Sequence, residues 1–142
     1  MRILIVSHLF RNPLEHSKLP NLFDLTQALA VHADVEIVAP IPWFPPLRIA
    51  KQWYKFSQIP REIRYGPVRV RYPRHLVFPY RILYALSGPT FLRALEKILN
   101  SERYDLLWAH YAFPDGWAAP ASFKSFSTIW SATCVERLPT VK

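Results

Sequence analysis

Three short, almost continuous apolar runs constrain the fold of this chain more than any other feature of its sequence. They lie at residues 2–7, 35–39 and 104–109. Such runs are typical of strands that are buried on both faces of a parallel sheet. Residues 68–72 instead alternate apolar and basic side chains, which indicates a strand near the sheet edge with one solvated face.

Apolar residues at helical spacing supply the connections that parallel strands need. We predict helices near residues 21–32 and 89–101, with Asn21 as the N-cap of the first and Asp24 as its capping-box partner. The predicted buried stripes are Leu22, Leu25, Ala28 and Leu29 in the first helix, and Leu92, Leu95, Ile98 and Leu99 in the second. Strands and helices in this order predict an α/β fold with a mostly parallel sheet.

Composition excludes several classes of protein. With 142 residues and a hydrophobic fraction of 51%, the chain is long and apolar enough for one domain, or for part of a larger one. It has no apolar run of the about 18 residues that a membrane span needs. The N-terminal run is too short for a signal peptide, and Cys134 stands alone, so we expect a cytoplasmic protein without an internal disulfide. Three glycines are too few for a Gly-rich phosphate loop, and no His/Cys cluster has metal-ligand spacing, so neither a cofactor nor a metal is predicted.

Polar residues that end the predicted strands are the first candidates for a ligand site. Ser7 and His8 end the first strand, the segment that contains Trp43 follows the second, and His110 ends the last. In open α/β sheets, ligands bind outside the carboxyl ends of the strands, so these residues are expected along one edge. The alternative for each histidine is a side chain that only hydrogen-bonds the neighbouring loop backbone.

Charge points to a second kind of contact. The net charge is +8, and residues 42–84 interleave basic with aromatic side chains. We predict an extended, Pro-punctuated insertion there, with solvated cations at Lys51, Lys55, Arg61 and Arg64. Such a stretch could bind nucleic acid, an anionic membrane surface or a phosphorylated substrate, or it could be a plain solvated face above aromatic core residues. Nucleic acid is not the partner that we expect, and peripheral contact at the inner membrane face is the arrangement that these cations suggest.

Three segments resemble a known family. They are "MRILIVSHLFRNPLEHSKLPNLFDLTQALA", "VEIVAPIPWFPP" and "YDLLWAHYAFPDGWAA", and together they resemble the N-terminal domain of a family 4 (group 1) glycosyltransferase. The resemblance implies the N-terminal half of a GT-B architecture, in which two Rossmann-like domains face each other across a cleft. It also implies sugar transfer from a nucleotide-sugar donor to a glycan or lipid-linked acceptor, usually without a metal. The donor is then a substrate that is bound mainly by the other domain.

The resemblance also adds to the candidate site. It implies that His110, Tyr111 and Asp115 lie in a loop that faces the cleft on the acceptor side. With the strand-end residues Ser7, His8 and Trp43, they are the predicted substrate-binding residues. Asp115 has a second interpretation as the cap of a helix that begins at "GWAA", and the two roles do not exclude each other. None of these residues is predicted to be catalytic.

The sequence departs from the family in two places. The segment "SHLFRNPLEHSKLP" after the first strand contains no glycine, and no Gly-Ser/Thr-Asp motif follows residue 119. We therefore expect a Rossmann-like domain over residues 1–119, a divergent tail over 120–142 and no donor-binding domain. Such a fragment would be inactive alone, with a separately encoded C-terminal domain as a candidate partner. The alternative function is a non-enzymatic basic and aromatic module that docks on an anionic membrane or nucleic acid.

Overall fold

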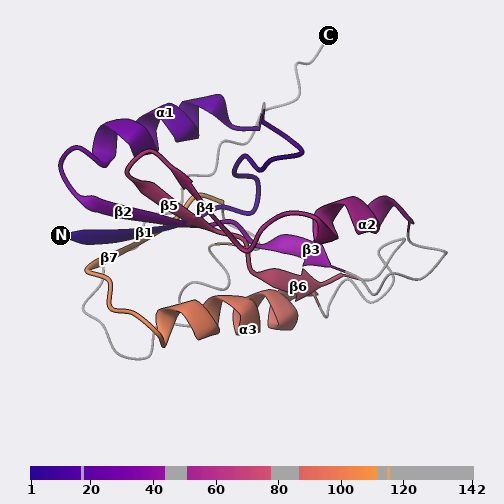
Figure 1. Ribbon diagram of the computed structural model, residues 1–142. Coiled ribbons are helices and arrows are strands. Elements are labelled where there is room, and N and C mark those ends of the chain that lie inside the picture. The colour runs from indigo at the N-terminus through magenta and orange to yellow at the C-terminus, as the bar shows by residue number, and fades with distance from the viewer. Residues whose placement is uncertain (17, 44–50, 78–86, 112–114, 116–142) are drawn as a thin grey trace, which may run out of the picture.

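A mostly parallel sheet forms the centre of the computed structural model, which describes residues 1–16, 18–43, 51–77, 87–111 and 115 (Figure 1). The main sheet contains β1 (Arg2–Val6), β2 (Asp34–Val38), β4 (Glu62–Tyr65), β5 (Val68–Arg71) and β7 (Leu106–Ala109), in the order β4-β5-β2-β1-β7. Strand β1 is parallel to both β2 and β7, β2 is parallel to β5, and only β4 is antiparallel to its neighbour. The predicted α/β fold with a Rossmann-like, mostly parallel sheet is confirmed.

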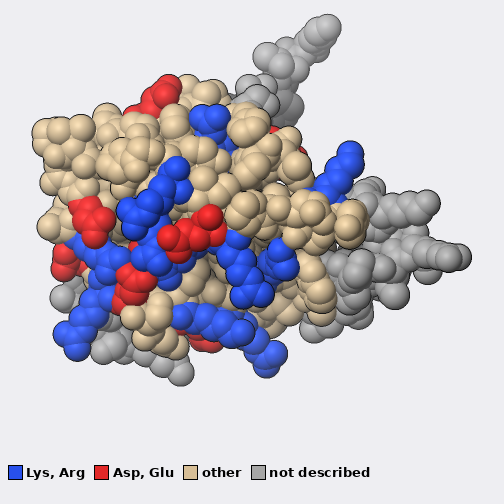
Figure 2. All heavy atoms as spheres, in the orientation of Figure 1, with Lys and Arg blue, Asp and Glu red and all other residues tan. Residues whose placement is uncertain are grey.

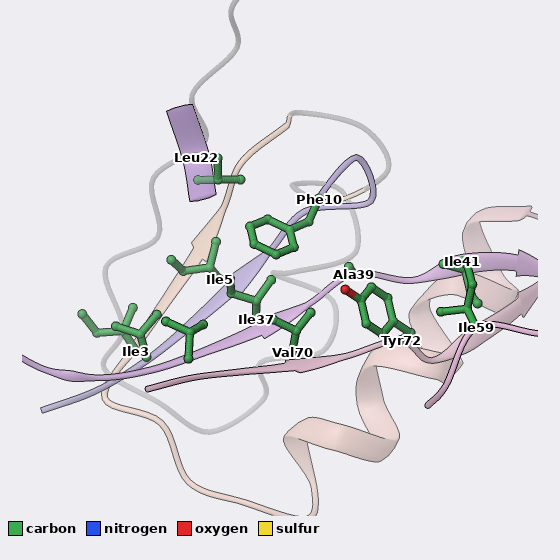
Figure 3. Packing of buried hydrophobic residues seen from close by; sticks show 12 residues of the cluster. Ile3, Ile5, Phe10, Leu22, Ile37, Ala39, Ile41, Ile59, Val70 and Tyr72 are labelled. Carbon is green, nitrogen blue, oxygen red and sulfur yellow. The ribbon is translucent and has the colours of Figure 1, made fainter. Parts of the chain in front are cut away.

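Helices cover the two faces of this sheet. Helix α1 (Pro20–Leu29) lies on one face and α3 (Ser87–Leu99) on the other (Figure 1). Alternate residues of β1 explain the continuous apolar run: Ile3 and Ile5 point to the α1 side, and Leu4 points to the α3 side. Figure 3 shows Ile3 and Ile5 packed with Ile37 and Val70 below Leu22 of α1. Both faces of the central strands are therefore buried, as the runs predicted.

The start of α1 differs from the prediction. The helix begins at Pro20, and its N-cap residue is Leu19, which has a φ of 43° and makes no side-chain capping bond. Proline suits the first helical position because its ring fixes φ and its missing N–H would have no helical partner there. Asn21 is therefore already inside the first turn, where it is exposed, and the predicted capping box with Asp24 is wrong.

The buried stripe of α1 is also shifted. Leu22 and Thr26 are buried, whereas Leu25 is 48% exposed and Ala28 is exposed. The Thr26 hydroxyl donates a hydrogen bond to the Phe23 carbonyl at 2.8 Å, so this polar residue can be buried in the stripe. The predicted places of Leu25 and Ala28 are wrong, because the helix turns Thr26 rather than these two residues toward the sheet. The stripe of α3 is confirmed, with Leu95 and Ile98 buried and Leu92 and Leu99 partly buried.

Replacing Asn21 with Ala tests the corrected helix start. A true N-cap would lose about 1 kcal/mol of stability on this change, but an exposed first-turn asparagine should change it by less than about 0.5 kcal/mol. Urea unfolding of the wild-type chain and Asn21→Ala at pH 7 measures the difference. A loss of 1 kcal/mol or more would restore Asn21 as the cap.

Residues 42–84 are more regular than predicted. Their described part contains β3 (Ile41–Trp43), α2 (Lys51–Ser57) and β6 (Arg74–Leu76) besides the β4–β5 hairpin. Strands β3 and β6 form a second, parallel sheet, and Gly66 closes the hairpin with a φ of 60°, which a glycine adopts without strain. The prediction of an extended insertion is therefore wrong for these segments, while residues 44–50 and 78–84 lie outside the described residues, as does the predicted tail over 120–142.

A buried carboxylate organises the α3-facing side of the sheet. Glu36 of β2 is 1% exposed, and it lies 3.2 Å from Arg2 Nη2, 3.7 Å from Arg69 Nη1 and 2.5 Å from Arg71 Nε. Glu102, in the turn after α3, pairs with the same three arginines. Figure 2 shows this mixture of basic and acidic side chains on one face of the molecule. Two basic residues of the stretch 42–84, Arg69 and Arg71, are therefore neutralised by carboxylates of the protein itself.

Candidate functional site at the carboxyl edge of the sheet

The carboxyl ends of β1 and β7 bring the predicted site residues together. Val6 of β1 is in register with Ala109 of β7, and the His110 backbone N–H donates to the Val6 carbonyl at 2.9 Å. Ser7, the residue that follows β1, donates its backbone N–H to the Val38 carbonyl of β2 at 3.0 Å. His8 and His110 therefore leave neighbouring strands at the same edge, which is where open parallel sheets bind ligands.

Asp115 is bound to His8 at two points. Its carboxylate accepts the His8 backbone N–H at 3.2 and 3.3 Å, and its Oδ2 lies 3.2 Å from Nδ1 of the His8 ring. Asp115 is 0% exposed, whereas the His8 side chain is 27% exposed. When Nδ1 carries the ring proton, it donates to Asp115, and Nε2 is left with a lone pair that can accept a proton from a ligand.

Tyr111 completes the cluster with His110. The Tyr111 ring lies 5.3 Å from the His8 ring and 4.8 Å from the His110 ring, in edge-to-face geometry with both. Trp108 of β7 packs behind His110 at 6.1 Å. Since aromatic pairs prefer such edge-to-face contacts, Tyr111 holds both histidine rings in place. We call His8, His110, Tyr111 and Asp115 the histidine cluster.

Burial changes the proton affinities within the histidine cluster. Burial raises the pKa of the Asp115 carboxyl above its ordinary value, and the hydrogen bond and charge of His8 oppose that rise. Burial lowers the pKa of His110, although the Asp115 charge favours its protonated form. The pKa of Tyr111 is raised by burial and by Asp115. His110 therefore stays neutral at pH 7, and its ring can both donate and accept hydrogen bonds.

A cavity of about 220 Å³ lies beside His8, between the segment that follows β1 and strand β3. Sequence reasoning missed four polar residues that line it, which are Asn12, Glu15, Lys18 and His75. The first three form a small network, in which Asn12 Nδ2 donates to Glu15 at 3.0 Å and Lys18 Nζ pairs with Glu15 at 2.8 Å. This network orders the segment that lacks glycine. In the sequence, the Asn-Pro pair at residues 12–13 is the pattern that indicates a turn in this segment.

Two predicted site residues do not join the histidine cluster. Ser7 is 0% exposed, so its side chain is sealed from any ligand. Trp43 ends β3, in register with Leu76 of β6, and makes no hydrogen bond or ring contact with the cluster within the described residues. The cap role of Asp115 concerns a helix whose residues lie outside the described ones. Among the residues that the structure describes, no group of three or more His, Cys, Asp or Glu could hold a metal ion.

The predicted solvated cations lie elsewhere on the chain. Lys55, Arg61 and Arg64 are exposed, and Lys51 is the first residue of α2. No described helix is long and apolar enough to cross a membrane.

Comparison with known proteins shows the fold. No family model and no curated protein matches the sequence. Among solved structures, the chain is similar to a sucrose-phosphate synthase from Thermosynechococcus elongatus, with a TM-score of 0.63 and 17% identity over 92% of this chain and 32% of the synthase. It is also similar to the C-terminal domain of a hydrogenase from Pyrococcus furiosus, with a TM-score of 0.57 and 13% identity over 94% of this chain and 90% of that domain.

Both likenesses are below 25% identity and therefore show the fold alone. The chain spans about a third of the length of the synthase chain that it matches. The likeness to the synthase supports a GT-B-like fold and does not show family 4. The chain is thus an α/β domain with a Rossmann-like sheet, similar in fold to part of a sucrose-phosphate synthase and to a hydrogenase domain.

Proposed function

We propose that this domain holds the acceptor of a GT-B glycosyltransferase, of family 4, which transfers a sugar from a nucleotide-sugar donor to a glycan or lipid-linked acceptor. One observation carries the proposal. The ring of His8 is held by buried Asp115 at the carboxyl edge of a parallel sheet, within a fold similar to part of a sucrose-phosphate synthase. This edge is where such sheets bind small molecules.

The histidine cluster suits a hydroxyl-rich ligand. Asp115 binds both the backbone N–H of His8 and Nδ1 of its ring, and so it fixes the ring. The other ring nitrogen, Nε2, can therefore take the proton of a hydroxyl group on the sugar acceptor. The neutral His110 ring adds a donor and an acceptor, and Tyr111 offers an aromatic ring edge beside both. In this proposal His8 orients the attacking hydroxyl, and Asp115 is a positioning residue that acts through His8.

The donor would bind to a second domain. Sugar transfer needs a wall that holds the nucleotide and stabilises the leaving diphosphate, and such electrostatic stabilisation is a large share of catalysis. The proposal assigns that wall to a C-terminal donor-binding domain, with which this domain would work. It follows that the 142-residue chain by itself should transfer no sugar. Turnover of a nucleotide sugar by the purified chain alone would contradict this part of the proposal.

Saccharide binding tests the acceptor role. A panel of neutral and acidic oligosaccharides is screened by saturation-transfer NMR, and the strongest binder is titrated against wild-type, His8→Gln and Asp115→Asn chains. We expect His8→Gln to weaken binding by about tenfold, since a ligand hydroxyl loses its hydrogen-bond partner. Asp115→Asn should weaken it less, because Asp115 acts only through the position of His8. It should also remove the pH dependence that the Asp115 carboxyl contributes, since burial raises the pKa of that carboxyl.

His32→Gln is the matched control, because His32 is exposed beyond the end of α1 and belongs to no candidate site. It should bind like the wild type. Absence of saccharide binding to the wild-type chain, or equal affinity of the His8 and His32 variants, would overturn the acceptor role.

The membrane-docking alternative keeps one supporting observation, which is the exposure of Lys55, Arg61 and Arg64. It is the weaker candidate, because it does not explain the paired His8 and Asp115. Binding to anionic vesicles that falls steeply with salt, without any saccharide binding, would favour it.

A further inference from the structure

A basic cleft lies between β6 and α3, and it shares His75 of β6 with the cavity beside His8. Its volume is about 420 Å³, which is in the range of small-molecule sites. Five of its lining residues are basic, namely Arg61, Arg71, Arg74, Arg93 and Lys97. No aspartate or glutamate is among the described residues that line it. Figure 2 shows Lys and Arg side chains gathered over α3 and above it.

Four of these cations have no acidic partner. Arg71 is neutralised, because its Nε lies 2.5 Å from Glu36 and it also pairs with Glu102. Within the part of the chain that the structure describes, Arg61, Arg74, Arg93 and Lys97 form no ion pair. This contrasts with the arginines around Glu36 on the same face, each of which meets a carboxylate. The cleft therefore keeps an excess of positive charge.

A hydrogen bond and the geometry of α3 hold three of these cations in defined positions. Arg74, which lines the cleft, donates from Nη2 to the Ser57 carbonyl at 2.7 Å, and this bond fixes its guanidinium. Arg93 and Lys97 are four residues apart on α3, so they extend from the same face of the helix. Like charges at this spacing destabilise a helix slightly, and a bound anion would remove that cost.

The chemistry of these groups selects a phosphate-bearing ligand. Guanidinium groups bind phosphate oxygens with two parallel hydrogen bonds, and a lysine adds a point charge. Four cations match a ligand with at least two negative charges. Leu76 and Ile98 contribute an apolar part of the wall, against which a non-phosphate portion of the ligand can pack.

We propose that this cleft binds the phosphate or diphosphate group of a phosphorylated ligand through Arg61, Arg74, Arg93 and Lys97. The site lies next to the candidate acceptor site, since His75 lines both this cleft and the cavity beside His8. The inference does not rest on the proposed acceptor function. A cleft that binds phosphate could serve a domain of this fold with or without sugar transfer.

Inorganic pyrophosphate is the probe for this site. Isothermal titration at low salt compares the wild-type chain with Arg93→Gln and Lys97→Gln, because both side chains are exposed and their loss should not unfold the domain. Each change is expected to weaken pyrophosphate binding by about tenfold, as for the loss of a charged hydrogen bond. Arg64→Gln is the control with the same change in net charge, since Arg64 is exposed on β4 and does not line the cleft.

The control should weaken binding by less than about twofold, because long-range attraction between exposed charges is screened. Equal losses in Arg64→Gln and Arg93→Gln would overturn the proposal, since pyrophosphate would then respond only to net charge. Absence of pyrophosphate binding to the wild-type chain, together with vesicle binding that Arg93→Gln does not change, would also overturn it.

A second titration separates two sources of the phosphate. Vesicles of phosphatidylcholine with phosphatidic acid are compared with phosphatidylcholine alone. Binding to the acidic vesicles that pyrophosphate displaces and Arg93→Gln weakens supports the cleft and assigns it to a lipid headgroup. Binding of pyrophosphate without any vesicle binding supports the cleft and assigns it to a soluble phosphate ester.

Discussion

Glu36→Gln is expected to lower the free energy of unfolding by about 3 kcal/mol, at the low end of the cost of breaking a buried ion pair. The carboxylate of Glu36 is buried, and the amide that replaces it leaves Arg2, Arg69 and Arg71 without one of their two shared charge partners. The loss of stability should stay below the upper end of the cost of breaking a buried ion pair, because Glu102 still pairs with the same arginines. Urea unfolding at pH 7 measures the difference.

Glu62→Gln is the control for this change. Glu62 also pairs with Arg69, at 3.1 Å, but its side chain is 42% exposed. Exposed pairs contribute little, so the control should lose less than about 1 kcal/mol. Equal losses for the two variants would show that burial of Glu36 does not decide its contribution.

Acid should destabilise the protein through His75. Burial lowers the pKa of this histidine to about 4 from its ordinary value of 6.5, and the nearby His8 charge acts in the same direction. The unfolded chain therefore binds a proton at higher pH than the folded chain does. The neutral His75 ring therefore contributes about 3 kcal/mol to the free energy of unfolding above pH 6.5, and this contribution is lost as the pH falls toward 4.

Unfolding curves of wild-type and His75→Gln chains between pH 7 and pH 4 test this slope. The variant also loses the ring contact of His75 with Phe91, which changes its stability at pH 7, so only the change with pH is compared. We expect the wild type to lose about 3 kcal/mol more than His75→Gln over this range. Parallel curves for wild type and His75→Gln would refute the prediction.

The parts of the fold that depend on local pattern could be predicted from the sequence. The runs that became β1, β2 and β7 are buried on both faces, and α3 has an unbroken apolar stripe. The short strands β3 and β6 carry no such pattern, because each has three residues and exists only by pairing with the other.

Partners that are distant in the chain could not be predicted. Glu36 was an interruption in an apolar run, and its arginines come from β1 and β5. His8 and Asp115 were each predicted from strand ends or from resemblance, but nothing local shows that the two residues, 107 positions apart, hydrogen-bond each other. His75 was missed for the same reason, since two clefts meet at it only after β6 has paired with β3.

The central place of β1 has a consequence for synthesis on the ribosome. Its first partner, β2, emerges soon after it, but β7 and Asp115 follow about a hundred residues after β1. At typical elongation rates of about 5–20 residues per second, one edge of an apolar strand therefore stays without its neighbour for several seconds. Exposed edges of this kind pair readily with other chains, so nascent copies should depend on a chaperone until residue 115 has emerged.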